Sequence, residues 1–131
     1  FEEVWQRPVL IMDYGAPAFA QDMASVEAEK LQVLAHERAW DDIKHHGAGG
    51  AGLGISLGGC VWEWVDGWWR DMDTRGGLSR QDTKPGPMGP FPDGHDYPEW
   101  YGLMALGKTQ QGALMRVPRK AYWAYTRLWS K

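Results

Sequence analysis

The stretch "GGCVWEWVDGWW", residues 58–69, gathers four tryptophans within eight residues and places Glu63 and Asp66 among them. Tryptophan is costly to expose to water, yet the polar residues that interrupt this run indicate that part of its aromatic surface is exposed. The whole chain holds nine Trp, seventeen Gly and eight Pro, a composition that indicates a rigid, loop-rich surface presenting flat rings. The pattern therefore raises the question of which ligand needs aromatic rings and carboxylates side by side.

Composition excludes several classes of function. The 131 residues fit one domain, and a 44% share of hydrophobic residues is enough for a core. The net charge is −3 and the basic residues are scattered, so we expect no nucleic-acid partner. No apolar run approaches the roughly 18 residues of a membrane helix, and we expect neither a membrane partner nor a signal peptide. The single Cys60 excludes an internal disulfide.

Two short apolar runs are predicted to be strands that position the candidate carboxylates. The first lies within "RPVLIMDYGAP", residues 7–17, where alternation puts Asp13 on the same face as Val9 and Ile11, close to the strand end. The second covers residues 59–66 and carries the tryptophan-rich motif. Both runs are apolar on both faces, which is typical of strands in a parallel sheet.

Helical periodicity predicts a helix over about residues 23–46, with Asp22 as its N-cap and Gly47 as its stop. A long irregular stretch over about 67–118 and a final amphipathic helix over about 118–130 complete the chain. We expect the first helix to cross between two adjacent parallel strands. Two strands cannot close a sheet, and a (β/α)8 barrel needs about 250 residues, so the pattern predicts an α/β chain that forms one quarter of a TIM barrel.

Two motifs resemble the family 2 glycoside hydrolases, the β-galactosidase and β-glucuronidase group within the clan A retaining glycosidases. "PVLIMDYGA" is similar to the seventh barrel strand of that family, and "GGCVWEWVDGWW" is similar to the eighth. The later segments "FPDGHDYPEWYGLM" and "RVPRKAYWAYTRLW" resemble the family's closing turn and helix. The resemblance implies that residues 1–131 are the C-terminal part of a glycoside hydrolase-like TIM-barrel domain and a fragment of a longer chain.

The resemblance also implies roles for individual residues. It places Asp13 at the position of the catalytic nucleophile and Trp62 beneath the sugar at the cleavage point. A Trp ring covers the apolar C–H face of a sugar while a nearby carboxylate accepts hydrogen bonds from its hydroxyl groups. This combination answers the question that the opening motif raises, and it makes a carbohydrate the expected partner.

One departure from the family concerns the nucleophile, which is Glu in the family and Asp13 here. The shorter side chain withdraws the attacking oxygen by about 1.5 Å, the length of one C–C bond. The family's acid/base residue follows an Asn on the fourth strand, and no Asn-Glu pair occurs in this chain. We therefore expect the rest of the barrel, or a companion chain, to supply that group.

Several residues keep two interpretations. Asp13 fits either a nucleophile or a turn cap, and Asp66 fits either a sugar contact or loop hydrogen bonding. Trp62 is expected at the site, Trp64 in the core, and Glu63 in a structural ion pair. Four further aromatic residues either line an extended sugar groove or attach the long loop to the body of the protein: Trp68, Trp69, Trp100 and Tyr101.

His95 and Asp96 lie in the long loop and are candidates for the rim of the site, with turn chemistry around Pro98 as the alternative. His45 and His46 have no distinctive ligand spacing, so no metal is assigned. The glycine-rich segment 47–59 lacks the Lys-Ser/Thr of a phosphate loop, and we expect no cofactor.

The leading hypothesis is therefore a glycoside hydrolase-like protein that hydrolyses β-linked sugars by retaining double displacement, once a second carboxylate is supplied. The first rival is a non-catalytic carbohydrate-binding protein, in which Asp13 only accepts hydrogen bonds from hydroxyl groups. The second rival is a structural piece whose aromatic residues pack against a partner chain. The sequence leaves the sugar and its linkage open.

Overall fold

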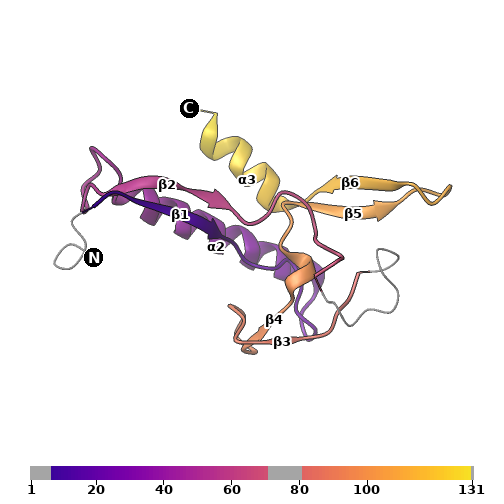
Figure 1. Cartoon of the computed structure of the whole chain (residues 1–131). Coiled ribbons are helices and arrows are strands. Elements are labelled where there is room, and N and C mark those ends of the chain that lie inside the picture. Colours follow the sequence, from indigo (N-terminus) through magenta and orange to yellow (C-terminus); the bar gives the residue numbers. More distant parts are fainter. Residues whose placement is uncertain (1–6, 71–80, 131) are drawn as a thin grey trace.

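The first three elements form a strand–helix–strand unit in the computed structural model, which describes residues 7–70 and 81–130. They are β1 (Val9–Tyr14), α2 (Ser25–His45) and β2 (Ser56–Val61). The two strands pair in parallel, and Figure 1 shows them side by side with α2 alongside. The parallel pairing predicted for these two strands is confirmed.

The boundaries of these elements differ from the prediction. Ala24, not Asp22, is the N-cap of α2, and no side chain caps this end of the helix. β2 begins and ends earlier than expected, because the glycine-rich residues 56–59 pair directly with β1. Trp62 therefore follows the strand instead of lying within it.

The stretch predicted to be irregular contains two antiparallel strand pairs. The hairpin of β5 (Met104–Lys108) and β6 (Leu114–Pro118) is joined by a turn in which Gly112 has a φ of +81°, a conformation that favours glycine. Figure 1 shows this hairpin projecting away from the β1–β2 pair. The remaining elements, in chain order, are β3 (Gly86–Pro87), β4 (His95–Asp96), the 3-10 helix η2 (Pro98–Trp100), β5 (Met104–Lys108), β6 (Leu114–Pro118) and α3 (Lys120–Trp129).

The prediction that the chain forms part of a (β/α)8 barrel is wrong. The described residues form two α-helices and three separate two-stranded sheets, none of them closed. Alternation of strand and helix ends at β2, because the chain between β2 and α3 folds into antiparallel pairs that do not join the β1–β2 sheet. The predicted alternation therefore holds for β1, α2 and β2 and does not continue beyond them.

Two small clusters of buried side chains form the core. The first joins the loop before α2 to the β3–β4 region through Ala20, Ala28, Phe91 and Tyr97. The second packs α3 beneath the parallel strands through Leu103, Ala121 and Tyr125. The core therefore lies on the helix side of β1 and β2 and around the loops that follow them.

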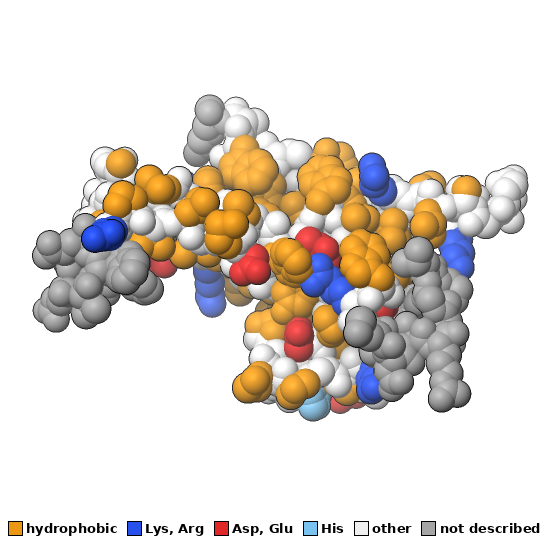
Figure 2. Space-filling model, in the orientation of Figure 1, with side chains coloured by type: hydrophobic (Ala, Val, Ile, Leu, Met, Phe, Trp, Pro, Cys, Tyr) orange, Lys and Arg blue, Asp and Glu red, His pale blue; other side chains and the backbone are white. Residues whose placement is uncertain are grey.

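The opposite side of the parallel strands is open. The exposed fraction of the residue's surface is 70% for Met12, 69% for Leu57 and 47% for Leu10. Figure 2 shows hydrophobic side chains gathered over β1 and β2 on this face of the molecule. Neither described helix combines the length and the apolar character needed to cross a membrane.

Candidate functional site

A cavity of about 360 Å³ lies where β1 and β2 end. Its volume falls in the range of roughly 300–1,000 Å³ that is typical of small-molecule sites. Polar surface dominates its lining, with aromatic rings among the carboxylates. The residues that matter chemically are Asp13, Trp62, Arg70, Asp96 and Tyr101.

Backbone hydrogen bonds bring the walls of this cavity together. The Trp62 N–H donates to the Tyr14 carbonyl at 2.8 Å, which joins the end of β1 to the residue that follows β2. The Glu63 N–H donates to the Tyr101 carbonyl at 3.3 Å, which adds the segment after η2. Gln32 of α2 is fully buried, and its amide donates to the carbonyls of Ala16 and Gly102 at 3.1 and 3.3 Å. One helix side chain therefore fixes the two loops that flank the site.

Asp13 presents an exposed carboxylate at the end of β1. Its side chain has no hydrogen bond or ion pair with any of the described residues. The turn-capping interpretation of Asp13 therefore has no supporting contact in the described part of the chain. Among the described residues, none competes with a ligand for this carboxylate.

Trp62 lies under a guanidinium group. The Arg70 Cζ atom is 4.1 Å from the centroid of the Trp62 ring, a cation–π contact. Arg70 also binds both carboxylate oxygens of Glu63, from Nε at 3.1 Å and from Nη2 at 2.7 Å. The predicted structural ion pair of Glu63 is therefore present. Burial raises the pKa of Glu63, while the hydrogen bonds and the charge of Arg70 oppose that rise.

The β4 strand contributes a second carboxylate. Asp96 Oδ1 accepts hydrogen bonds from the Tyr97 N–H and from the Tyr101 hydroxyl, each at 2.8 Å. Burial, together with the Asp96 carboxylate, raises the pKa of Tyr101 and keeps its hydroxyl protonated. Tyr101 thus contributes a polar aromatic wall without charge. Asp96 keeps its other oxygen, Oδ2, free of hydrogen bonds from the described residues.

Asp66 lies outside the cavity and is fully buried. Arg119 donates to both of its oxygens, and the distance from Nη2 to Oδ2 is 2.7 Å. The Gly102 N–H and the Gln81 amide complete its contacts at 3.0 and 2.9 Å. Of the two interpretations of Asp66, loop hydrogen bonding is the one that the structure shows.

Of the other predicted aromatic residues, some are buried or pack against the body of the protein and others are exposed. Trp68 is buried, and Trp100 stacks on Phe19 with ring centroids 4.5 Å apart and donates to the Asp82 carbonyl. The Trp100 contacts attach the long loop to the body of the protein, and the burial of Trp68 keeps it from lining a sugar groove. Trp69 is exposed but does not line the cavity. Trp64, expected in the core, is 55% exposed, so that prediction is wrong.

His95 is exposed beside Asp96, and its backbone N–H donates to Asp93 Oδ1 at 2.9 Å. This contact belongs to the turn between β3 and β4, and not to the turn around Pro98 that the alternative interpretation named. The His95 side chain has no described hydrogen bond and is not part of the cavity lining. Only Asp96 of this pair belongs to the site.

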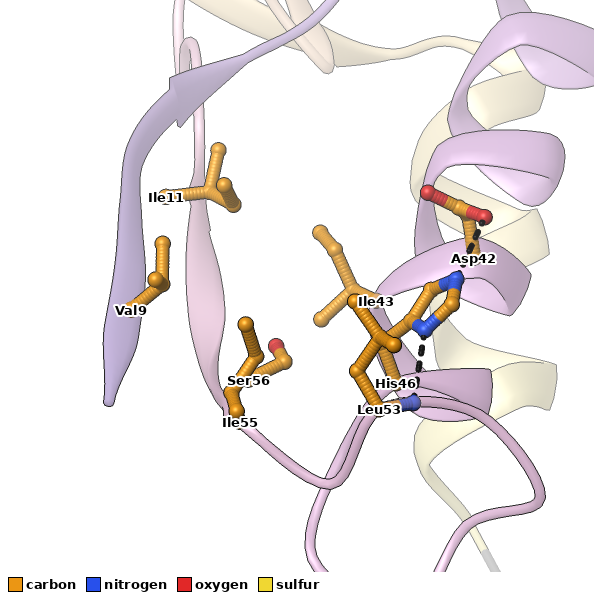
Figure 3. Close-up of a pocket in the computed structure, with 8 residues that line it drawn as sticks. All are labelled: Val9, Ile11, Asp42, Ile43, His46, Leu53, Ile55 and Ser56. Atoms are coloured by element: carbon orange, nitrogen blue, oxygen red, sulfur yellow. Dashed lines mark hydrogen bonds and ion pairs between the residues drawn. The ribbon is translucent and has the colours of Figure 1, made fainter. Parts of the chain in front are cut away.

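A second cavity, of about 220 Å³, lies between β1, β2 and the end of α2 and is lined mainly by apolar side chains (Figure 3). His46 Nδ1 accepts a hydrogen bond from the Leu53 N–H at 3.0 Å, and its Nε2 lies 3.7 Å from Asp42 Oδ1. Across residues 7–70 and 81–130, no three His, Cys, Asp or Glu side chains are grouped to hold a metal ion. This cavity contains none of the predicted site residues.

Comparisons with protein-family models, with curated proteins and with solved structures found no match to this chain. The geometry of the cavity at the ends of β1 and β2 therefore carries the functional argument. The sequence did not predict Arg70 as a site residue. For Tyr101 it left two alternatives, lining a sugar groove or attaching the long loop to the body of the protein. Arg70 directly follows the tryptophan motif, but nothing in the sequence pairs it with Glu63, seven positions earlier.

Proposed function

We propose that this protein binds a β-linked carbohydrate in the cavity at the ends of β1 and β2 and hydrolyses it as a glycoside hydrolase-like protein. One observation carries the proposal. Asp13 and Trp62, which come from two separate sequence motifs, line a single open cavity together with Asp96 and Tyr101. Flat rings and unpaired carboxylate oxygens are the groups that a sugar ring and its hydroxyls require.

The proposed mechanism assigns attack on the anomeric carbon to the Asp13 carboxylate. Trp62 supports the sugar ring with the face that Arg70 does not cover, and the Tyr101 and Asp96 pair accepts hydrogen bonds from hydroxyl groups. A retaining reaction also needs a second carboxyl group about 5–5.5 Å from the first, to protonate the leaving oxygen and then activate water. In the resemblance to family 2 glycosidases, that group comes from an Asn-Glu pair that this chain does not contain.

A second candidate function is carbohydrate binding without hydrolysis, and one observation favours it. Asp96 is the other carboxylate in the described cavity, and two donors already occupy its Oδ1. That arrangement suits an acceptor of hydrogen bonds from hydroxyl groups better than a donor of a proton to a leaving group. In this case Asp13 has the same role as an acceptor.

The first experiment measures binding of methyl β-glucoside, β-galactoside and β-mannoside to the wild-type chain by titration calorimetry. Trp62→Ala is expected to weaken binding about threefold to tenfold, because it removes a stacking surface worth roughly 0.5–1.5 kcal/mol. Trp123→Ala is the matched control: its side chain is 54% exposed on α3, and it does not line the cavity. Equal effects of the two substitutions would remove Trp62 from the site.

Hydrolysis of the corresponding aryl β-glycosides separates the two candidate functions. Turnover by the wild type that Asp13→Asn abolishes supports the hydrolase, because the amide cannot form the glycosyl ester. Binding without turnover, in an assay that also contains the source of the second carboxylate, supports the carbohydrate-binding protein. Failure of the wild type to bind any of the sugars contradicts both candidates.

A further inference from the structure

The cavity at the ends of β1 and β2 has an unbalanced charge. Asp13 and Asp96 are acidic, and Arg70 is the one basic residue in its described lining. Two carboxylates and one arginine give a formal charge of −1, and the Glu63 carboxylate that binds Arg70 makes it −2. Tyr101 adds no charge because its hydroxyl stays protonated.

The arginine is already engaged and is poorly placed to bind an anion. Two of its N–H groups, at Nε and Nη2, form a bidentate pair with Glu63, and its planar face lies over Trp62. A ligand carboxylate at this point would compete with Glu63 and would also face Asp13 and Asp96. Like charges that line the same cavity disfavour binding of an anion, so a carboxylated sugar does not fit the cavity.

The carboxylates of Asp13 and Asp96 receive few hydrogen bonds from the described residues. Within residues 7–70 and 81–130, the Asp13 carboxylate has no partner and Asp96 Oδ2 accepts no hydrogen bond. They approach the cavity from different elements, the end of β1 and the β4 strand. An ammonium group supplies three N–H donors and a positive charge, and charge-assisted hydrogen bonds to carboxylates are stronger than those from hydroxyl groups.

We infer that the cavity selects a β-linked amino sugar with a free, protonated amine over neutral and carboxylated sugars. The inference rests on the proposed carbohydrate binding and names the class of sugar that is bound. The carboxylates of Asp13 and Asp96 receive the ammonium group, and the face of Trp62 that Arg70 does not cover packs on the apolar face of the sugar ring. Selectivity then follows from charge, while the ring contact is common to all sugars.

The experiment compares four ligands of similar size on the wild-type chain at pH 6: methyl β-glucosaminide, its N-acetyl derivative, methyl β-glucoside and methyl β-glucuronide. The free amine is expected to bind about tenfold tighter than the N-acetyl and neutral sugars, as one charge-assisted hydrogen bond provides. The glucuronide is expected to bind most weakly. The advantage of the amine should shrink in 0.5 M salt, because added ions screen exposed charges.

Asp96→Asn and Asp13→Asn test the two carboxylates without changing the shape of either side chain. Each variant is expected to lower the ratio of glucosaminide to glucoside affinity about threefold or more. A ratio cancels any general loss of binding. Asp41→Asn is the control, because it changes the net charge of the protein equally from an exposed site on α2. Thermal unfolding of each variant verifies that it folds.

Each outcome has a distinct meaning. Equal binding of the glucosaminide and the neutral glucoside, or tighter binding of the glucuronide, overturns the inference about charge and leaves carbohydrate binding intact. An unchanged ratio in both variants also overturns it, because the selectivity would then come from elsewhere. Failure of the wild type to bind any of the four sugars overturns the proposed function itself.

Discussion

Asp13 is one methylene shorter than the glutamate found at the matching position of the resembling glycosidases. If the protein hydrolyses sugars, Asp13→Glu should restore the reach of the carboxylate and raise turnover of an aryl β-glycoside about tenfold to a hundredfold. Steady-state rates of the two proteins, assayed together with the source of the second carboxylate, provide the measurement. Lower activity in the glutamate variant would mean that the backbone has adapted to aspartate.

The buried Asp66–Arg119 pair belongs to the stability of the protein. Asp66→Ala would leave the Arg119 guanidinium buried and without its carboxylate, so we expect a loss of about 3–5 kcal/mol in the free energy of unfolding. Urea unfolding measures this loss. Glu27→Gln is the control, because its exposed pair with Lys30 should contribute less than about 1 kcal/mol. Similar losses of unfolding free energy in the two variants would show that the buried Asp66–Arg119 pair contributes no more to stability than an exposed ion pair.

His36 should make stability depend on pH. Burial lowers the pKa of His36 from 6.5 to about 4, and its Nε2 atom has no hydrogen-bond partner among the described residues. Between pH 6.5 and 4 the unfolded chain therefore binds more protons than the folded chain, and stability falls as the pH is lowered through this window. We expect the protein to be about 2 kcal/mol less stable at pH 5 than at pH 7.5 from this group alone.

Urea unfolding of the wild type and His36→Gln at the two pH values isolates the contribution of His36. The variant should lose that part of the pH dependence, whereas His45→Gln, at an exposed position, should keep it. An identical pH dependence in the wild type and His36→Gln would contradict the prediction.

At the scale of elements, the joint between β1 and the residue after β2 is tightly packed. A Cβ atom at Gly15 would lie 1.9 Å from the Trp62 carbonyl oxygen and 3.3 Å from the Tyr101 ring. Gly15→Ala must therefore push the two walls of the cavity apart. We expect it to destabilise the protein by roughly 1–3 kcal/mol and to weaken sugar binding at the same time.

Gly107→Ala in β5 provides the matched control, because a Cβ atom there would lie 3.5 Å from its nearest neighbour, a side-chain atom of Val117 in β6, which is ordinary van der Waals contact. Thermal unfolding and sugar titration of both variants make the comparison. Normal sugar binding by a stable Gly15→Ala protein would show that the joint does not shape the cavity.

The long stretch after β2 shows why some elements could not be predicted. Its Gly and Pro residues correctly indicate turns. The strands β3 and β4, on either side of Gly89, are however only two residues long. A strand of that length has no alternating pattern to detect. The β5–β6 hairpin is longer, yet its strands are half exposed or exposed throughout, so no hydrophobic face marks them.

At the scale of the whole molecule, the open face of β1 and β2 should cause association. Both strands of a parallel sheet are normally covered on both faces, and exposed apolar patches favour contact with other chains. We expect the wild-type chain to be oligomeric in sedimentation experiments. Met12→Lys with Leu57→Lys should shift it toward the monomer, because both side chains are among the most exposed on this face.

Met88→Lys is the control for added charge, since Met88 is 94% exposed and lies far along the chain from β1 and β2. It should leave the oligomeric state unchanged. A monomeric wild type with a sharp, cooperative melt would contradict the prediction of association.

The sequence by itself determined the parallel strand–helix–strand unit and the position of Asp13 near the end of its first strand. Both depend on local patterns, namely apolar runs, helical spacing and turn residues, which act over a few positions. Only the tertiary structure placed Trp62, Arg70 and Tyr101 in the cavity with Asp13, retained Asp96 but not His95 from the predicted rim, and excluded Asp66. Arg119 lies 53 positions from Asp66, and no local pattern marks a pair at that separation. The same limit explains the wrong barrel prediction, because sheet closure depends on which distant strands pair and not on the order of elements.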